Sequence, residues 1–248
     1  NTEAKAWMEQ SAFSYGIYNI GQATIKNLET NLVSHASKIT TTTIARTQGK
    51  SGSTSIINDG IMTMEDCYLY DKNDTNGYSS QSYNGNIFNT AISIINNKDA
   101  ILAGYNVRIE SVSNTDYNSS QVILCMGIEN YGELNLSKSN IKATSEFCSS
   151  SSVNCGIYNE GIVSLGENEP VDITTLSRTT TYGVSNCAGS VKDFSGEILA
   201  QTLSSSSEAY GIFNQDAGVV TLGIDDGEVT LDTIGIIGIT AGINGFEE

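Results

Sequence analysis

The sequence predicts an all-β fold, a solenoid in which short strands stack coil upon coil. Three observations predict it. One tetrapeptide recurs along the chain, a tight turn follows most of its copies, and apolar residues then alternate with period two.

The recurring tetrapeptide has the form Gly-Ile-x-Asn. Copies read GIYN ending at Asn19, SIIN at Asn58, NIFN at Asn89, GIEN at Asn130, GIYN at Asn159, GVSN at Asn186 and GIFN at Asn214, and a degenerate AGIN ends at Asn244. The steps between these asparagines are 39, 31, 41, 29, 27, 28 and 30 residues. Repeats of this length indicate a solenoid, a propeller or an array.

The residues after each tetrapeptide predict a corner and then a strand. In Asn159-Glu160-Gly161, as in most copies, Asn and Gly are the residues that best tolerate left-handed backbone geometry, which indicates a tight corner. Val163 and Leu165 follow with period two and therefore lie on one face of a strand. A propeller blade needs four strands in about 40 residues, so the shorter repeats favour a triangular coil of parallel strands.

On these residues the chain resembles the right-handed parallel β-helix proteins of the pectin-lyase-like superfamily. It resembles more closely the YGIYN-x-G repeats of large secreted and surface proteins of anaerobic bacteria. The matching segments are Tyr15–Gly21, Cys155–Gly161 and Tyr210–Asn214. The resemblance implies a single-stranded right-handed parallel β-helix of about eight coils with terminal caps. It also implies a corner ladder of hydrogen-bonded side chains, expected at Asn19, Asn58, Asn89, Asn130, Asn159, Asn186 and Asn214.

The extent of the repeat predicts the domain organisation. Residues 1–12 are expected to form an N-terminal cap. A short helix within Thr2–Gln10 is the expected structure of this cap. Residues 13–248 are expected to form the β-helix domain, closed at its far end by Ile234–Phe246. Caps are expected because uncovered edge strands invite aggregation.

Composition argues against two kinds of partner. The 28 acidic and 12 basic residues give a formal charge of −16, which repels phosphate backbones, so nucleic acid is not expected to bind. No apolar run approaches the roughly 20 residues of a membrane helix, so this segment is not expected to insert into a membrane. Together with the resemblance, this predicts an extracellular or cell-surface location.

No metal or cofactor site is predicted. The five cysteines are interpreted as small buried hydrophobes, with a Cys148–Cys155 disulfide as the alternative. The segment Asp71–Gly77, DKNDTNG, resembles a calcium loop, but its glycine falls one place late. Asp71–Gly77 and the acidic Asp225–Glu228 are therefore interpreted as Asx-rich surface turns, and calcium stays an alternative.

The candidate ligand site is a stripe of outward side chains. In Gly-Ile-x-Asn the recurring Ile is expected to face the core, which sends x outward. The x positions are Tyr18, Ile57, Phe88, Glu129, Tyr158, Ser185 and Phe213. Exposed rings stacked one coil apart suit the apolar faces of sugars or a protein partner. The candidate binding residues are therefore Tyr18, Phe88, Tyr158 and Phe213.

These observations predict a non-enzymatic surface or secreted module, a stalk or adhesin that binds a carbohydrate or protein ligand. The alternative is a polysaccharide lyase or glycoside hydrolase acting on acidic polysaccharide, and a third interpretation is a pure spacer. The resemblance implies a Gly-His-Gly segment in glycosidases of this fold, which the single histidine, His35, does not provide. No catalytic residue is assigned. Carboxylates gathered across coils beside Arg108 or Arg178 would favour the enzyme.

Overall fold

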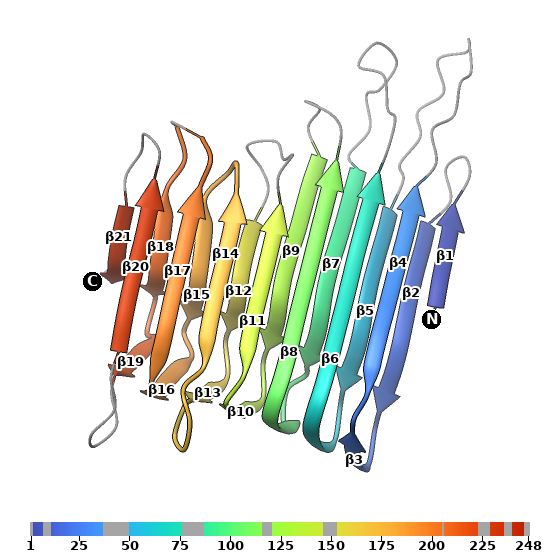
Figure 1. Cartoon of the computed structure of the whole chain (residues 1–248), viewed down its shortest axis with the longest axis horizontal. Helices are drawn as coiled ribbons and strands as arrows, with labels where there is room; N and C mark the ends of the chain where they lie inside the picture. The colour runs from blue at the N-terminus through green and yellow to red at the C-terminus, as the bar shows by residue number, and fades with distance from the viewer. Residues whose placement is uncertain are drawn as a thin grey trace.

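The computed structural model describes residues 2–6, 11–36, 50–75, 87–115, 121–145, 153–204, 206–222, 229–235 and 240–245, with side chains over most of 15–28, 53–72, 90–113, 124–145 and 153–221. Every regular element in these ranges is a β-strand. The strands form two curled sheets in which all described pairings are parallel, a β-solenoid-like arrangement (Figure 1).

The first sheet holds the strands that carry the tetrapeptide. Its eight strands run in the order β2-β5-β7-β9-β12-β15-β18-β21, so each coil contributes one strand beside that of the previous coil. Their bounds are β2 Ser11–Asn19, β5 Lys50–Asn58, β7 Ile87–Asn96, β9 Gln121–Asn130, β12 Val153–Asn159, β15 Thr181–Cys187, β18 Ala209–Gln215 and β21 Thr240–Gly245.

The second sheet has thirteen strands and turns a corner of its own. The strands before the corner are β3 Gln22–Lys26, β10 Glu133–Ser137, β13 Ile162–Leu165, β16 Ser190–Phe194 and β19 Val219–Leu222. Those after it are β1 Thr2–Ala6, β4 Glu29–Ala36, β11 Asn140–Ser145, β14 Asp172–Ser177, β17 Gly196–Thr202 and β20 Val229–Gly235. The long strands β6 Ile61–Thr75 and β8 Ile101–Thr115 run through it.

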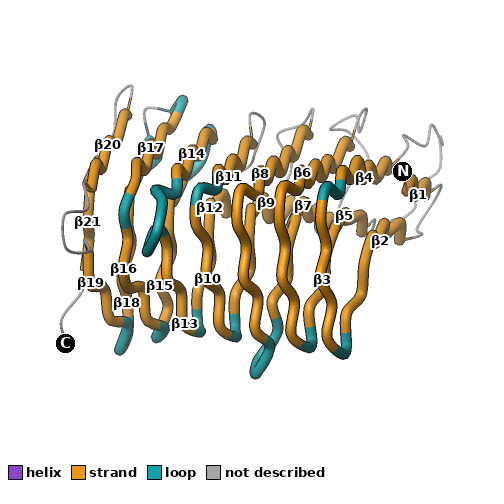
Figure 2. Tube along the Cα trace, turned by 60° about the horizontal axis from the view of Figure 1, so that its bottom comes forward, coloured by secondary structure: helices purple, strands orange, loops and turns teal. Residues whose placement is uncertain are grey.

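Left-handed residues make this second corner. Asn27, Asp66, Asn106 and Lys138 have φ values of 55°, 53°, 52° and 50° and lie at corresponding positions of four successive coils. Asn and Asp tolerate this conformation better than most residues do. Each coil therefore has three strand segments, and the coils stack along one axis (Figure 2).

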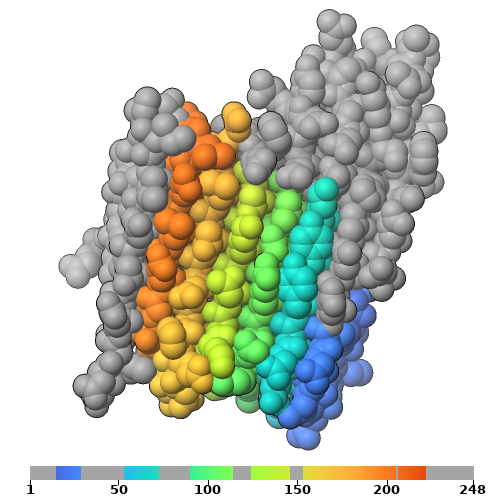
Figure 3. Space-filling model, viewed as in Figure 1, coloured from blue at the N-terminus to red at the C-terminus, as the bar shows by residue number. Residues whose placement is uncertain are grey.

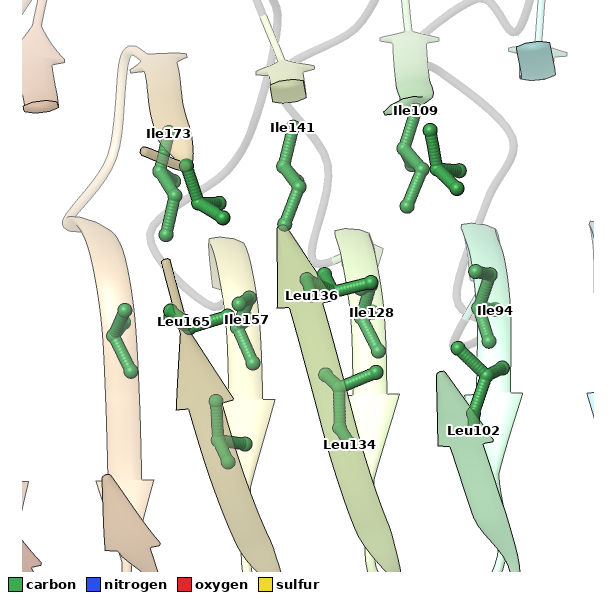
Figure 4. Packing of buried hydrophobic residues seen from close by; sticks show 14 of the residues in the cluster. Ile94, Leu102, Ile109, Ile128, Leu134, Leu136, Ile141, Ile157, Leu165 and Ile173 are labelled. Carbon is green, nitrogen blue, oxygen red and sulfur yellow. The ribbon is translucent and has the colours of Figure 1, made fainter. Parts of the chain in front are cut away.

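The core fills the space between the sheets. Ile94, Ile128 and Ile157 of the first sheet face aliphatic side chains of the second, with the same residue type repeated from coil to coil (Figure 4). All three are fully buried, and burying such a side chain contributes about 1.5–3 kcal/mol. From outside, the coils form parallel stripes because each packs only on its neighbours (Figure 3).

Both ends of the chain differ from the expected caps. Thr2–Ala6 is a strand, β1, that pairs in parallel with β4, so the expected helix in Thr2–Gln10 is wrong for these residues; residues 7–10 lie outside the described part. At the other end, Ile234 belongs to β20, and Thr240–Gly245 pairs in parallel with β18. Each of these segments pairs with a strand of the neighbouring coil, so it continues the stack.

Candidate functional site

A row of buried asparagines lines the corner that precedes the second sheet. Each Nδ2 donates to the Oδ1 of the asparagine in the next coil. Along Asn19, Asn58, Asn96, Asn130, Asn159, Asn186 and Asn214 the Nδ2–Oδ1 distances are 2.7, 2.8, 2.8, 2.8, 2.7 and 2.6 Å. Asn130 Nδ2 also lies 3.1 Å from the carbonyl oxygen of Gly132, so the same side chain closes its own corner. The row is structural, because its amides bind one another and the backbone.

Asn96 occupies the position in this row that the sequence analysis gave to Asn89. Asn96 is paired with Asn58 and Asn130 in the sheet, whereas Asn89 lies seven residues earlier in β7, opposite Ser51 and Ile123. The steps from Asn58 to Asn96 and from Asn96 to Asn130 are 38 and 34 residues. The tetrapeptide SIIN at 55–58 recurs at 93–96 and could have shown this.

The x residues form one column on the outer face of the first sheet. The register aligns Tyr18, Ile57, Ile95, Glu129, Tyr158, Ser185 and Phe213. Ile95 therefore stands where Phe88 was expected, and the side chain of Phe88 lies outside the described part. Tyr18 is 63% exposed, whereas Tyr158 and Phe213 are partly buried. Asn244 pairs with Phe213 and thus extends this column, not the asparagine row.

A second column on the same face was not predicted. It aligns Tyr15, Thr54, Ile92, Met126, Cys155, Tyr182 and Tyr210, three residues before each x position. Ile92, Met126 and Cys155 pack together away from the main core, in contact with partly buried side chains such as Tyr158. Cys155 and Tyr158 are three positions apart, an odd spacing, yet both side chains lie on the outer face. The strand is irregular between them, because Gly156 is left out of the register that pairs Cys155 with Met126 and Ile157 with Ile128. A strictly alternating strand would place Tyr15 and Tyr18 of the YGIYN repeat on opposite faces, so the second column does not follow from alternation.

Aromatic rings meet at the C-terminal end of this face. The ring centroids of Tyr182 and Tyr210 lie 5.7 Å apart and are stacked, and Phe213 lies 5.2 Å from both. Tyr131 and Tyr158 meet edge to face at 6.2 Å. Such pairs add about 0.5–1.5 kcal/mol beyond their burial and hold the rings in fixed orientations.

Carboxylates tether the tyrosine hydroxyls on this face. Tyr18 donates to Asp59 of the next coil, and Tyr158 donates to Glu160 at 2.5 Å. The hydrogen bond to Asp59 raises the pKa of Tyr18, and burial, followed by the bond to Glu160, raises the pKa of Tyr158. Both phenols therefore stay neutral at physiological pH. We call the two columns together the aromatic face.

Asp71 does not lie in an Asx-rich surface turn, so that interpretation of the segment is wrong for this residue. It lies within β6, which continues to Thr75, and its side chain is fully buried in the interior. Ser55 Oγ donates to Asp71 Oδ2 at 2.6 Å, while Oδ1 has no hydrogen-bond partner in the described structure. Burial raises the pKa of Asp71 to about 7, against the opposing effect of the Ser55 and Ser93 hydroxyls. Residues 76–77 and 225–228 lie outside the described part.

The described cysteines are buried free thiols. Cys67, Cys125, Cys155 and Cys187 are all reduced, so Cys155 is not in the disulfide with Cys148 that was the alternative; Cys148 itself lies outside the described residues. Over the described ranges, no three His, Cys, Asp or Glu side chains converge in a way that could hold a metal ion.

The two arginines that could mark a catalytic site differ in their surroundings. Arg108 lies 3.5 Å from one carboxylate, Glu110, and its guanidinium lies 5.0 Å from the ring centroid of Tyr68. Glu110 is shared with Lys142 at 3.3 Å. Arg178 is exposed, and its carbonyl oxygen accepts a hydrogen bond from Ser207. Glu110 is therefore an ion-pair partner of both Arg108 and Lys142.

Comparisons with models of known protein families, with curated proteins and with solved structures found no match to this chain. Within the described ranges, no helix of the length and apolarity needed to span a membrane occurs.

Proposed function

We propose that this chain is a non-enzymatic binding module, a secreted or cell-surface right-handed parallel β-helix of the pectin-lyase-like kind, that holds a carbohydrate or protein ligand on its aromatic face. The observation that carries the proposal is the continuous double column from Tyr15 and Tyr18 to Tyr210 and Phe213. In the first coil the side chains of Tyr15 and Tyr18 are 53% and 63% exposed, and exposed apolar groups that lie together often mark a binding surface.

The chemistry of the aromatic face suits a polyhydroxylated or mixed polar ligand. Rings supply apolar area for the C–H faces of a sugar or for apolar side chains of a partner. The carboxylates of Asp59 and Glu160 hold the hydroxyls of Tyr18 and Tyr158 in place. Because the rings are already ordered in the free protein, binding costs little side-chain entropy.

The enzyme alternative has weaker support. A lyase or hydrolase needs several carboxylates at one point, and the acid beside Arg108 is Glu110, which also pairs with Lys142. The spacer interpretation gives no reason for the two exposed tyrosines, Tyr15 and Tyr18, that lie side by side in the first coil.

Native electrophoresis through gels cast with single polysaccharides tests the proposal. The gels contain neutral polymers or uronate polymers, each with and without calcium. Slower migration without clearing of the gel supports binding, and its loss in Tyr18→Ala and Tyr158→Ala places the ligand on the aromatic face. Val219→Ala, at an exposed position of β19 in the second sheet, is the control and should migrate as the wild type does in those gels. Clearing of a gel would show an enzyme, and unchanged mobility in every gel would contradict the carbohydrate part of the proposal.

A further inference from the structure

A pocket of about 420 Å³ lies on a different face, over the strands β6, β8, β10 and β13. This volume is within the usual range for small-molecule sites. Six of the residues that line it are Thr63, Ala103, Tyr105, Asn135, Ser137 and Glu167. They belong to four successive coils, so the pocket is elongated along the stacking axis.

Short side chains form the floor of the pocket. The register aligns Thr63, Ala103, Asn135 and Ser164 across four neighbouring strands. Small side chains in a row leave a depression, and neighbouring strands place these groups about 4.8 Å apart. The hydroxyl of Thr63 and the amide of Asn135 are therefore two strands apart, with Ala103 between them, a separation that roughly two sugars of an extended glycan would span.

A loop with no counterpart in the preceding coil forms one wall. Three residues separate Leu136 from Asn140, whereas six separate Leu165 from Asp172 at the corresponding corner. The extra residues extend the connection from β13 to β14 (Figure 1). This loop contributes Glu167 and Asn168 to the pocket.

Tyr105 presents an ordered ring at the pocket. Its side chain is 40% exposed, and its hydroxyl donates to Glu169 Oε1 of the loop at 2.8 Å. Lys138 lies 3.7 Å from Glu169 Oε2 and has its Nζ 5.5 Å from the centroid of the Tyr105 ring. These contacts join the strand to the loop and fix the ring, as a stacking platform for a sugar requires.

The charge of the lining selects against acidic ligands. Glu65 and Glu167 are its only charged residues, so the pocket contains two carboxylates and no cation. Glu65 pairs with Lys26 outside the pocket, and Glu167 has no ion-pair partner in the described part of the chain. A uronate chain would be repelled here, whereas the hydroxyls of a neutral sugar can donate to Glu167.

We propose that this pocket binds a segment of a neutral, extended polysaccharide. One sugar ring stacks on Tyr105, and the hydroxyls of neighbouring sugars bond to Thr63, Asn135 and Glu167. The proposal does not depend on the aromatic face, which lies on the other sheet.

Isothermal titration with neutral hexasaccharides tests this site. The probes are cellohexaose, xylohexaose, mannohexaose and laminarihexaose, with hexagalacturonate as the acidic comparison. We expect at least one neutral probe to bind with a Kd below about 1 mM, and hexagalacturonate to bind at least tenfold more weakly. Tyr105→Ala should weaken binding about tenfold, the value of one lost ring stack. Ala103→Trp should abolish binding, because the indole fills the floor.

Val219→Ala, at an exposed position outside the pocket and outside the aromatic face, is the control and should bind the neutral probe as the wild type does. Circular dichroism of each variant shows whether it folds. Three results would each overturn the proposal: saturation with none of the neutral probes, equal affinity for hexagalacturonate, or equal weakening by Val219→Ala and Tyr105→Ala. Loss of binding in Tyr105→Ala alone would leave the function of the aromatic face open, so the two sites are tested separately.

Discussion

Ser55 Oγ donates a hydrogen bond of 2.6 Å to Asp71 Oδ2 in the interior of the solenoid, and both residues are fully buried. The strand-turn-strand path brings together two residues sixteen positions apart. It places a carboxyl group among serine side chains, where its other oxygen has no hydrogen-bond partner in the described structure. Such a group is stable when it is protonated and costly when it is charged.

The stability of the protein should therefore fall as the pH rises. Burial raises the pKa of Asp71 from 3.8 to about 7, so between these values the folded chain binds more protons than the unfolded chain. The contribution to the free energy of unfolding is fully present below pH 3.8 and is lost as the pH rises through 7. Its size is at most about 4 kcal/mol. Urea unfolding at pH values from 4 to 8 measures it.

Asp71→Asn should remove this pH dependence, since the amide has the shape of the acid but does not titrate. Relative to the wild type, the variant should gain stability steadily from pH 4 to pH 8. Asp99→Asn, at an exposed turn, controls for the loss of one negative charge. Parallel stability curves for the wild type and Asp71→Asn would contradict the buried, protonated acid.

Replacing one asparagine in the buried row should destabilise the fold strongly. Asn130→Ala removes the donor to Asn159 Oδ1 and the acceptor for Asn96 Nδ2, both at 2.8 Å. Asn96 Nδ2 keeps its bond to the Glu133 carbonyl oxygen and Asn159 Oδ1 keeps its bond from the Gly161 amide, but each buried atom loses a partner. The bond from Asn130 Nδ2 to the Gly132 carbonyl oxygen is lost as well, and together these losses cost about 3 kcal/mol in the free energy of unfolding. The exposed Asn140→Ala should change that energy by less than about 0.5 kcal/mol. Equal losses in the two variants would show that the row contributes little.

The corner glycines should differ in their tolerance of a methyl group. A Cβ at Gly161 would lie 2.1 Å from the carbonyl oxygen of Gly132, whereas a Cβ at Gly21 would have nothing within 4 Å. Gly161→Ala should therefore cost about 2–3 kcal/mol, because stacked backbones must separate. Gly21→Ala should be nearly neutral. Thermal melting of the pair checks this, and similar melting temperatures would argue against close stacking of the corners.

Cys155 should be unreactive in the folded protein. Its thiol is fully buried beneath the aromatic face, and burial raises its pKa, so little thiolate forms at neutral pH. We expect iodoacetamide at pH 8 to leave the Cys155 peptide unmodified in the native state and to modify it in urea. Peptide mass spectrometry distinguishes the states. Rapid alkylation of this peptide without denaturant would mean that the outer face opens.

The sequence predicted the repeating strands and the corner because both depend on local chemistry. Asn159 and Gly161 predict a tight turn, because few other residues tolerate its backbone geometry. Val163 and Leu165 predict which face of the next strand is apolar. Periodicity in one chain is visible without any tertiary contact. The same local reasoning misplaced one asparagine, because NIFN at Asn89 and SIIN at Asn96 both resemble the repeat, and the pairing of Asn96 with Asn58 and Asn130 decides between them.

The candidate sites depended on relationships between coils. Tyr18, Tyr158 and Phe213 follow from alternation, but Tyr15, Tyr182 and Tyr210 share their face only because the strands are irregular at an intervening glycine. Thr63, Tyr105 and Glu167 lie in three different coils, far apart in sequence, and nothing local marks them as neighbours.

The sequence by itself thus determined that this protein is built from repeated short strands joined at Asn-containing corners, because backbone preference and side-chain alternation act over a few residues. The tertiary structure alone decided which residues align between coils, since register is set by the packing of whole coils on one another. That packing put Asp71 inside the core, Ile95 in the place expected for Phe88, and a polar pocket beside Tyr105.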